Sequence, residues 1–302
     1  MSAPTQQLEP VGRPALDVLV VGGGAAGTTA ALVLARARHR VVLADDRTYR
    51  NRSVGEFHGF PSRDATAPAA FLADAHHELR RYEVDCVGSQ VVEASTDGDG
   101  FAVHFANRRR VEVGCIVIAT GVRDELPPIR GLAERWGRSA FNCPFCDGWE
   151  HRDRPVAVID AAPGAAHLAE LLGAWTKQVT VVPATHVTAI DGPGTTLERV
   201  VLGDGSSVPA SAVFVKAPVT PRSELAVALG CALDADGFVL TDAAGRTTNR
   251  RVWCGGDVRR SPPSPHQVVL AAADGSSAAI DIHKAFVAGH FEPRPTTDRS
   301  ER

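Results

Sequence analysis

A glycine-rich segment near the N-terminus constrains the fold of this chain more than any other feature. An uncharged apolar run, Val18–Val21, is followed by a helical apolar pattern that starts near Ala25. Between them lie glycines in the spacing Gly-x-Gly-x-x-Gly, namely Gly22, Gly24 and Gly27. The first permits a tight turn, the second lets the backbone approach a pyrophosphate at the helix N-terminus, and the third lets helix and strand pack closely. We therefore predict a parallel strand, a turn and a helix that bind a dinucleotide.

An acid at the end of the next predicted strand supports this interpretation. The run Arg40–Asp46 is typical of a second parallel strand, and Asp45 near its end is placed to accept hydrogen bonds from a ribose. A glycine-rich turn that binds no ligand is the alternative.

Two units with the same order of elements follow one another along the chain. The first continues with a helix over 67–82, three short strands (SQVVEAS, FAVHFA and RVEV) and a buried strand over 115–121. The second starts with the strand Pro155–Asp160 and repeats this order up to AVFVKA. The sequence predicts an α/β fold with two Rossmann-like, three-layer domains of the dinucleotide-binding type. The segment His76–Tyr82 is expected to be a solvated helix face.

Composition and charge exclude several classes of function. The net charge of −3 over 302 residues provides no basic patch for nucleic acid and no polybasic segment for a membrane surface. The start, MSAPTQQLEPVG, lacks the regions of a signal peptide. The uncharged stretch Val18–Ala35 is explained by the strand, turn and helix above rather than by a membrane span. We expect a cytoplasmic protein with no nucleic-acid or membrane partner.

A second motif lies near the C-terminus, where Gly255, Gly256 and Asp257 end the predicted strand RVWCGGDV and precede a long helix of small residues. An Asp at a strand end can hydrogen-bond the ribityl–phosphate part of FAD, while the following helix N-terminus faces the flavin. A surface turn is the alternative, because Gly-Asp is common in turns. The two motifs together favour FAD, bound by a domain built from both ends of the chain.

A close-spaced cysteine pair stands in the middle of the chain. Among six cysteines only Cys143 and Cys146, in FNCPFCDGWE, are near one another, which does not indicate a disulfide scaffold. Such a pair can cycle between dithiol and disulfide, and Asp147 offers an acid or base for the thiol protons. Half of a zinc site is the alternative, but zinc needs four ligands and only His151 could supply a third. We therefore expect no metal.

The motifs in combination resemble the low-molecular-weight thioredoxin reductase family. The residues that carry the resemblance are ATG after a strand (Ala119–Gly121), CPFCDG between the two units, and GGDV with a following HQVV, and it covers about residues 16–288. The resemblance implies an FAD domain, an inserted pyridine-nucleotide-type domain and a homodimer. It implies that Cys146 faces the flavin, that Cys143 meets the substrate, and that Asp147 is the acid/base.

The resemblance also implies domain boundaries and site residues. The FAD-binding domain would comprise 16–122 and 245–290, and the inserted domain 123–244. The polar tails 1–15 and 291–302 are expected to be disordered. The catalytic residues expected are Cys143, Cys146, Asp147 and His266, the last as a base for a substrate thiol or as a structural contact. The expected cofactor-binding residues are Gly22, Gly24, Ala25, Ala26, Gly27, Asp45, Asp46, Arg50, Asn51, His58, Ala119, Thr120, Gly121, Gly256, Asp257, Gln267 and Val268.

The second unit departs from the family where it should bind NADPH. The glycine pattern Gly-x-Gly-x-x-Ala is replaced by Asp160, Ala162 and Ala165. A carboxylate close to a pyrophosphate costs about 1–4 kcal/mol per charge pair. The family's His-Arg-Arg run after the next strand is replaced by 183–185, Pro-Ala-Thr, so the arginines that match a 2′-phosphate are missing. A changed loop that still binds NADPH in another way is the alternative.

These departures favour electron flow from a substrate dithiol to the Cys143–Cys146 pair, then to FAD and to dioxygen, with hydrogen peroxide as product. This resembles the gliotoxin- and holomycin-type dithiol oxidases, which act on small natural products. The alternatives are a disulfide reductase of thioredoxin type, fed by NADPH or another donor such as ferredoxin, and a non-catalytic FAD-binding redox sensor. Phe145 and Trp149 could line an apolar substrate pocket or serve only in packing.

Overall fold

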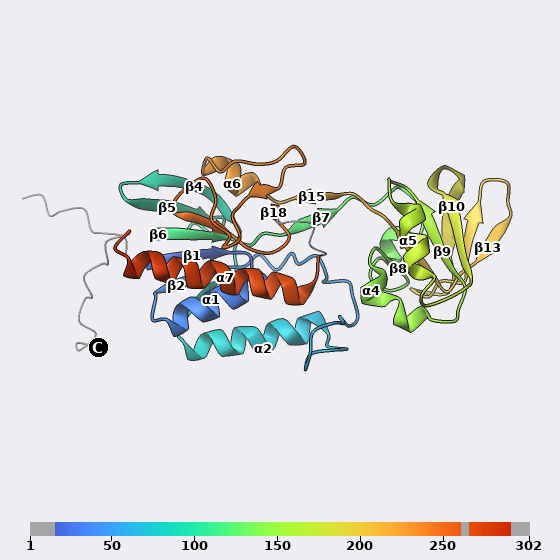
Figure 1. Cartoon of the computed structure of the whole chain (residues 1–302), viewed down its shortest axis with the longest axis horizontal. Coiled ribbons are helices and arrows are strands. Elements are labelled where there is room, and N and C mark those ends of the chain that lie inside the picture. The colour runs from blue at the N-terminus through green and yellow to red at the C-terminus, as the bar shows by residue number, and fades with distance from the viewer. Residues whose placement is uncertain (1–15, 261–265, 291–302) are drawn as a thin grey trace, which may run out of the picture.

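The computed structural model describes residues 16–260 and 266–290, which form two lobes of unequal size joined by two extended segments (Figure 1). The larger lobe contains both ends of the described chain, and the smaller lobe is built from its middle. The two tails predicted to be disordered lie outside the described residues. In the part of the chain that is described, no helix has the length and apolar character to cross a membrane.

The principal elements are β1 (Leu16–Val21), α1 (Ala25–Arg36), β2 (Val41–Ala44), α2 (Pro68–Arg81), β3 (Asp85–Val87), β4 (Val91–Asp97), β5 (Gly100–Phe105), β6 (Arg110–Ile118), β7 (Val122–Asp124), α3 (Leu132–Arg135), β8 (Ala140–Phe141), α4 (Pro144–Asp147), β9 (Val156–Asp160), α5 (Ala165–Leu172), β10 (Val179–Pro183), β11 (Val187–Asp191), β12 (Arg199–Leu202), β13 (Ser207–Pro209), β14 (Ala212–Val215), β15 (Val219–Pro221), α6 (Glu224–Ala228), β16 (Val239–Leu240), β17 (Val252–Cys254), β18 (Arg259–Arg260) and α7 (Val268–Val287).

The larger lobe is organised around a sheet with the strand order β3-β2-β1-β6-β5-β4, in which β17 also pairs with β6. The pairs of β1 with β2 and β6, of β2 with β3, and of β6 with β17 are all parallel. The predicted strand, glycine turn and helix at the N-terminus are confirmed, and α1 begins at Ala25 as expected. The second strand is shorter than predicted, so Asp45 follows β2 instead of lying within it.

One strand, β6, corrects the sequence interpretation. We expected RVEV and CIVIATG to be separate strands, but RVEV, Gly114 and CIVI form one continuous strand of nine residues, and ATG follows its end. Its first half pairs antiparallel with β5, as at Phe101↔Val113, and its second half pairs parallel with β17, as at Ile116↔Val252. In the sequence, Gly114 between the two halves resembles the end of one strand and the start of another, because an isolated glycine weakens a strand pattern.

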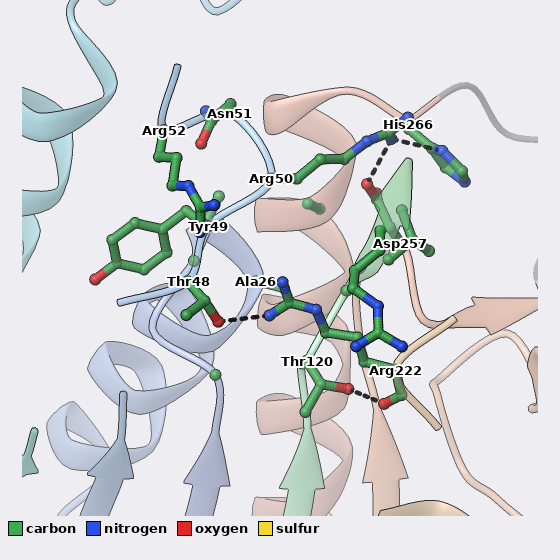
Figure 2. Close-up of a pocket in the computed structure, with 18 of the residues that line it drawn as sticks. Ala26, Thr48, Tyr49, Arg50, Asn51, Arg52, Thr120, Arg222, Asp257 and His266 are labelled. Atoms are coloured by element: carbon green, nitrogen blue, oxygen red, sulfur yellow. Dashed lines mark hydrogen bonds and ion pairs between the residues drawn. The ribbon is translucent and has the colours of Figure 1, made fainter. Parts of the chain in front are cut away.

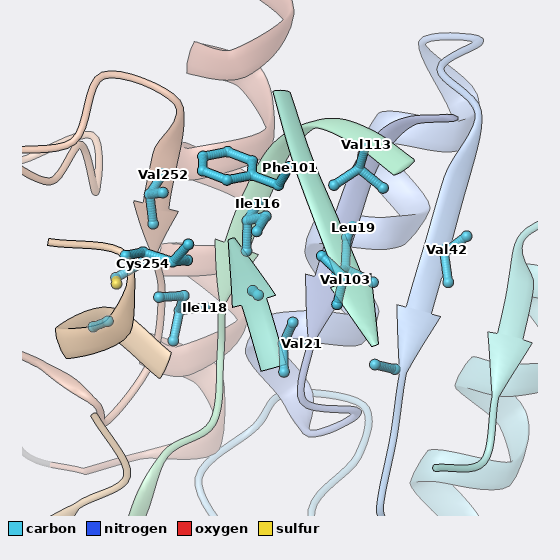
Figure 3. Close-up of a cluster of buried hydrophobic side chains, with 14 of the residues drawn as sticks. Leu19, Val21, Val42, Phe101, Val103, Val113, Ile116, Ile118, Val252 and Cys254 are labelled. Carbon is cyan, nitrogen blue, oxygen red and sulfur yellow. The ribbon is translucent and has the colours of Figure 1, made fainter. Parts of the chain in front are cut away.

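Two apolar layers enclose the parallel strands. Val18 and Val20 face α1 and α7, where Ala30 and Ala278 are fully buried. Leu19 points the other way and packs against residues of β5, as Figure 3 shows for Phe101 and Val103. Burial on both faces explains why β1 is apolar without alternation. Helices, parallel strands and antiparallel strands form the three predicted layers.

The smaller lobe repeats this plan. Its parallel sheet has the order β10-β9-β14-β8, and β11, β12 and β13 form an antiparallel sheet. On one side the strands pack against α5 through Leu168 and Leu172. On the other side Ile159 and Val213 pack with Ile190 and Val200 of the antiparallel strands. The prediction of two Rossmann-like units is therefore confirmed.

The chain passes between the lobes through the antiparallel pair of β7 and β15. Residues after β15 return to the larger lobe, because Ala226, Leu229, Cys231 and Val239 belong to the core that contains Leu19. The packing therefore differs from the expected boundary at residue 244, which assigned this segment to the inserted unit. The sequence offered no signal for this return, because α6 and β16 are too short for a periodic pattern.

Close contact between α1 and α7 depends on glycine. A Cβ added to Gly275 would lie 2.0 Å from the carbonyl oxygen of Ala26. Gly27 is equally constrained, since its Cβ would lie 1.7 Å from the carbonyl oxygen of Gly22. Helix α7 can approach α1 this closely only because Gly275 lacks a side chain, and α1 can pack on the turn after β1 only because Gly27 lacks one.

We expect Gly275→Ala to lower the free energy of unfolding by about 1–3 kcal/mol or more, because α7 must move away from α1. Gly88→Ala is the matched control, since its added Cβ would meet no atom within 4 Å. The measurement is chemical denaturation of both variants and the wild type. Equal stability of the Gly275 variant and the control would contradict the packing argument.

Candidate active site

A cavity of about 1300 Å³ is lined by residues of both lobes. This volume exceeds the roughly 300–1000 Å³ of sites for drug-sized ligands and suits a dinucleotide with additional space. All four predicted catalytic residues and every predicted cofactor-binding residue except Gly27 line this cavity. Gly27 instead packs beneath the turn, against Gly22. The structure therefore brings together positions that lie as far apart in sequence as Gly22 and Val268.

The glycine turn forms a cradle at the carboxyl end of β1. Gly22 has a φ of +110°, and a Cβ there would lie 2.3 Å from the carbonyl oxygen of Ala119. A Cβ added at Gly24 would meet nothing within 4 Å, so its backbone is open to the cavity. The first N–H groups of α1 have no acceptor within the helix and carry partial positive charge. This cradle fits the diphosphate of a dinucleotide.

The predicted ribose-binding acid is already engaged by the protein. Asp45 is buried and accepts hydrogen bonds from the Tyr49 hydroxyl, from the Arg47 N–H at 2.9 Å and from His76 Nε2 at 3.2 Å. Contact with Asp45 raises the pKa of His76 to about 9, with Cys86 adding to the effect. His76 is therefore not part of a purely solvated helix face, which corrects that expectation. The ribose contact of Asp45 stays a prediction.

Arg50 is the centre of a charged network at the cavity wall (Figure 2). Its guanidinium pairs with Asp124 of β7 at 2.6 Å and with Asp257, which follows β17, at 3.3 Å. The carboxylates hold the pKa of Arg50 above its usual value despite burial, which acts in the opposite direction. Asp257 thus lines the cavity as predicted, and its carboxylate also neutralises Arg50.

The same network determines the protonation of His266. Its Nδ1 lies 2.8 Å from Arg50 Nη1. Arginine only donates hydrogen bonds, so Nδ1 is the acceptor and the ring proton resides on Nε2. His266 therefore offers no free lone pair to a substrate thiol in this arrangement. The geometry favours the structural contact over the role of a base.

The cysteine pair faces the cavity from the smaller lobe. Cys143 and Cys146 form a disulfide across the start of α4, with 5.3 Å between their Cα atoms. Gln267, at the start of α7 in the larger lobe, places Nε2 3.8 Å from the sulfur of Cys143 and 3.5 Å from that of Cys146. This contact brings the disulfide to the same helix N-terminus that the sequence assigned to the flavin site. Over the described residues, no group of three or more metal-ligating side chains occurs.

Asp147 is the titratable group beside the disulfide. Burial, together with the negative charge of Glu150, raises its pKa to about 7, and His58 acts in the opposite direction. His58 comes from the larger lobe, and its Nε2 lies 3.7 Å from Glu150. A carboxyl group with a pKa near neutrality can both accept and release a proton, which is the requirement for an acid/base.

The strand–helix turn of the smaller lobe has a different shape from the glycine cradle. Asp160 is the exposed last residue of β9, and α5 begins only at Ala165. In the smaller lobe, Gly164, with a φ of +104°, is the last residue before α5. In the larger lobe, the glycine turn after β1 leads into α1 at Ala25. The alanines and the acid found in the sequence thus lie at the position where a second diphosphate would approach.

Sequence reasoning missed several cavity residues that carry no motif. Thr48, Tyr49, Lys216 and Arg222 all line the cavity. Arg222 Nη1 donates to Thr48 Oγ1 over 2.6 Å (Figure 2). The pattern Pro-Arg-Ser that contains Arg222 indicates a turn and nothing more.

Phe145 and Trp149, the two aromatic residues next to the cysteine pair in sequence, differ in position. Phe145 lines the cavity and is 63% exposed, with its ring edge-to-face on Trp175 at a centroid distance of 5.6 Å. Trp149 is equally exposed but lies beneath the guanidinium of Arg152, 4.3 Å from the ring centroid. Of the two, only Phe145 is among the residues that line the cavity.

A dinucleotide cradle and a Cys-x-x-Cys disulfide that share one cavity define a thiol–disulfide oxidoreductase. The model of the pyridine nucleotide-disulphide oxidoreductase family matches residues 16–186 and 175–275. The chain belongs to this family of flavin-dependent oxidoreductases.

Individual relatives agree with this family. The thioredoxin reductase tcpT of Claviceps purpurea is 30% identical over 311 residues, with 91% of each chain covered. The thioredoxin reductase sirT of Leptosphaeria maculans is 32% identical over 191 residues, which cover 59% of this chain and 58% of that protein. These relatives confirm the resemblance to thioredoxin reductases.

Solved structures show the same fold. The crystal structure of HlmI has a TM-score of 0.85 and 36% identity, covering 91% of this chain and 93% of that one. An oxidoreductase from Agrobacterium tumefaciens has a TM-score of 0.82 and 33% identity, covering 90% of this chain and 99% of that one.

The charges around Asp147 predict opposite pH shifts in two variants. Glu150→Gln removes a like charge and should lower the pKa of Asp147, whereas His58→Gln removes a group that lowers it and should raise that pKa. The measurement is the pH dependence of the rate at which dithiothreitol reduces the disulfide. Asp147→Asn is the control, because its profile should lack this limb. Unchanged profiles in both variants would exclude Asp147 as the titrating group.

Proposed function

We propose that the protein is an FAD-dependent dithiol oxidase that closes a disulfide in a small-molecule dithiol, with dioxygen as electron acceptor. One observation carries the proposal. The Cys143–Cys146 disulfide shares a cavity with an intact glycine cradle, while the equivalent turn of the smaller lobe contains Asp160 in place of glycine.

The chain provides the groups that would hold FAD. The cradle of Gly22–Gly24 and the first turn of α1 would take the diphosphate, and Asp257 and the start of α7 line the same cavity near the disulfide. FAD, when bound, supplies a two-electron acceptor for the cysteine pair and returns the electrons to dioxygen, which becomes hydrogen peroxide.

The protein's own residues account for the sulfur chemistry. A substrate thiolate attacks Cys143 Sγ, the Cys143–Cys146 bond breaks, and Cys146 leaves as a thiolate. The second substrate thiolate attacks the substrate sulfur of this mixed disulfide, which releases Cys143 and closes the substrate disulfide. The substrate loses two electrons and two protons, and the cysteine pair gains the two electrons. Asp147, with a pKa of about 7, can accept a proton from a substrate thiol.

The smaller lobe gives no support to a nicotinamide donor. The exposed carboxylate of Asp160 would repel a diphosphate, and Ala162 adds a methyl group where the backbone would make contact. The strand β10 ends in Pro183, and the residues that follow, Ala184–His186, offer no arginine for a 2′-phosphate. A reaction in which a substrate dithiol supplies the electrons requires neither a diphosphate-binding turn nor a 2′-phosphate site in this lobe.

The surroundings of the disulfide favour a small apolar substrate. Phe145 stands between the two cysteines in sequence and presents an exposed ring to the cavity. An aromatic face beside a reactive sulfur suits a flat or apolar dithiol. The assembly implied by the family resemblance, a homodimer, is part of the same proposal, and light scattering would test it.

The similarity to thioredoxin reductases favours a second candidate, a thioredoxin-type disulfide reductase. An anaerobic titration of the purified flavoprotein separates the two. We expect NADPH to leave the visible flavin band unchanged, whereas a small dithiol bleaches it and air restores it with release of hydrogen peroxide. Bleaching by NADPH, followed by reduction of a thioredoxin disulfide, would establish the reductase instead.

Replacement of either cysteine tests the route of the electrons. We expect Cys143→Ser and Cys146→Ser to lower dithiol turnover roughly 10³-fold or more, because no exchange can occur, while FAD stays bound. Cys86→Ser is the matched control, since Cys86 is a free cysteine outside the cavity lining. Wild-type protein that binds FAD but turns over no dithiol would support the redox sensor.

A further inference from the structure

Arg222, which none of the sequence motifs singled out, lies in the cavity wall directly after β15. Its backbone is held at the carboxyl end of β6: its N–H donates to the Gly121 carbonyl over 2.9 Å, and its carbonyl accepts from Thr120 Oγ1 over 2.6 Å. Its side chain donates from Nη1 to Thr48 Oγ1 over 2.6 Å (Figure 2). The arginine therefore bridges the end of β6 and the loop that follows β2.

Among the residues that the structure describes, no carboxylate pairs with the charge of Arg222. Within the two described ranges of the chain, its guanidinium makes no ion pair, and Nε is shut off from solvent without a hydrogen-bond acceptor. The nearest link to an acid runs through Thr48, whose hydroxyl donates to Asp46 over 2.6 Å. A buried donor or charge left unsatisfied is unfavourable, so an anion at this place would be stabilised.

Arg50, a second arginine in the cavity wall, cannot serve such an anion. Arg50 is neutralised by Asp124 and Asp257. Arg222, by contrast, keeps an unused donor on the same cavity that Gly24 and Ala26 line at the start of α1. A guanidinium is the side chain whose donors best match phosphate oxygens.

We propose that Arg222 binds the diphosphate of the dinucleotide, as a second anion-binding element beside the glycine cradle. The inference rests on the FAD assignment of the proposed function but not on the oxidase reaction. It gives the segment after β15 a role in holding the cofactor, because the residue that leads the chain back from the smaller lobe would contact a ligand of the larger lobe.

The test uses the apoprotein with four probes: FAD, ADP, riboflavin and adenosine. We expect Arg222→Met to raise the dissociation constants of FAD and ADP by roughly 10- to 100-fold, because a hydrogen bond to a charged group is lost. The constants for riboflavin and adenosine, which lack a diphosphate, should change less than about twofold. Arg222→Lys, which keeps the charge, should recover part of the affinity. Arg81→Met is the matched control, since Arg81 is an exposed arginine outside the cavity lining, and its affinities should equal those of the wild type.

Thermal unfolding distinguishes this role from that of a structural brace. Removal of an unpaired charge should leave the melting temperature of the apoprotein unchanged or raise it, and should reduce the increase that saturating FAD produces. Wild-type affinity for FAD and ADP in Arg222→Met, or a melting temperature that falls by the same amount in the apoprotein and in the FAD-saturated protein, would overturn the proposal. A wild-type chain that binds neither FAD nor ADP would overturn it as well. If the wild type binds FAD and the variant loses affinity, but no dithiol is oxidised, the proposed function fails while the role of Arg222 is supported.

Discussion

The partly buried pairing of Arg50 with Asp124 and Asp257 is the interaction on which the site depends. It joins three segments that are remote in sequence: the loop after β2, the connecting strand β7 and the end of β17. Removal of one partner of a buried ion pair typically costs about 3–5 kcal/mol, because the remaining charge is left uncompensated. Since β7 leads into the smaller lobe, this pairing helps to fix the approach of that lobe, and with it the disulfide, to the cavity.

The two lobes share a plan but have diverged in chemistry. The larger lobe keeps the glycines that let a backbone surround a diphosphate, and the smaller lobe has lost them at the equivalent turn. What the smaller lobe contributes is α4, which presents Cys143 and Cys146 beside Gln267. A duplicated nucleotide-binding architecture is thereby compatible with a reaction in which one unit holds the cofactor and the other holds the sulfur chemistry.

The pKa of Asp147, the acid beside the disulfide, depends on burial more than on direct ion pairing. Asp147 has its pKa raised to about 7 mainly because it is removed from water, and Glu150 and His58 adjust it in opposite directions. His58 belongs to the larger lobe, so the proton affinity of Asp147 depends on the relative position of the lobes. His266 illustrates the converse case, in which an arginine occupies the lone pair that a base would need.

The sequence alone determined the glycine cradle, the close-spaced cysteine pair with its neighbouring acid, and the absence of the glycine pattern from the equivalent turn of the smaller lobe, because each is set by the spacing of neighbouring residues. Gly22, with a φ of +110°, is needed for the local backbone conformation, and the spacing of Cys143 and Cys146 keeps their sulfurs within bonding reach. Only the tertiary structure decided that β6 is continuous, that the chain returns to the larger lobe at β15, and that Nε of Arg222 finds no hydrogen-bond acceptor among the described residues. Charge compensation and proton affinity arise from groups far apart in sequence, whose distances no local pattern encodes.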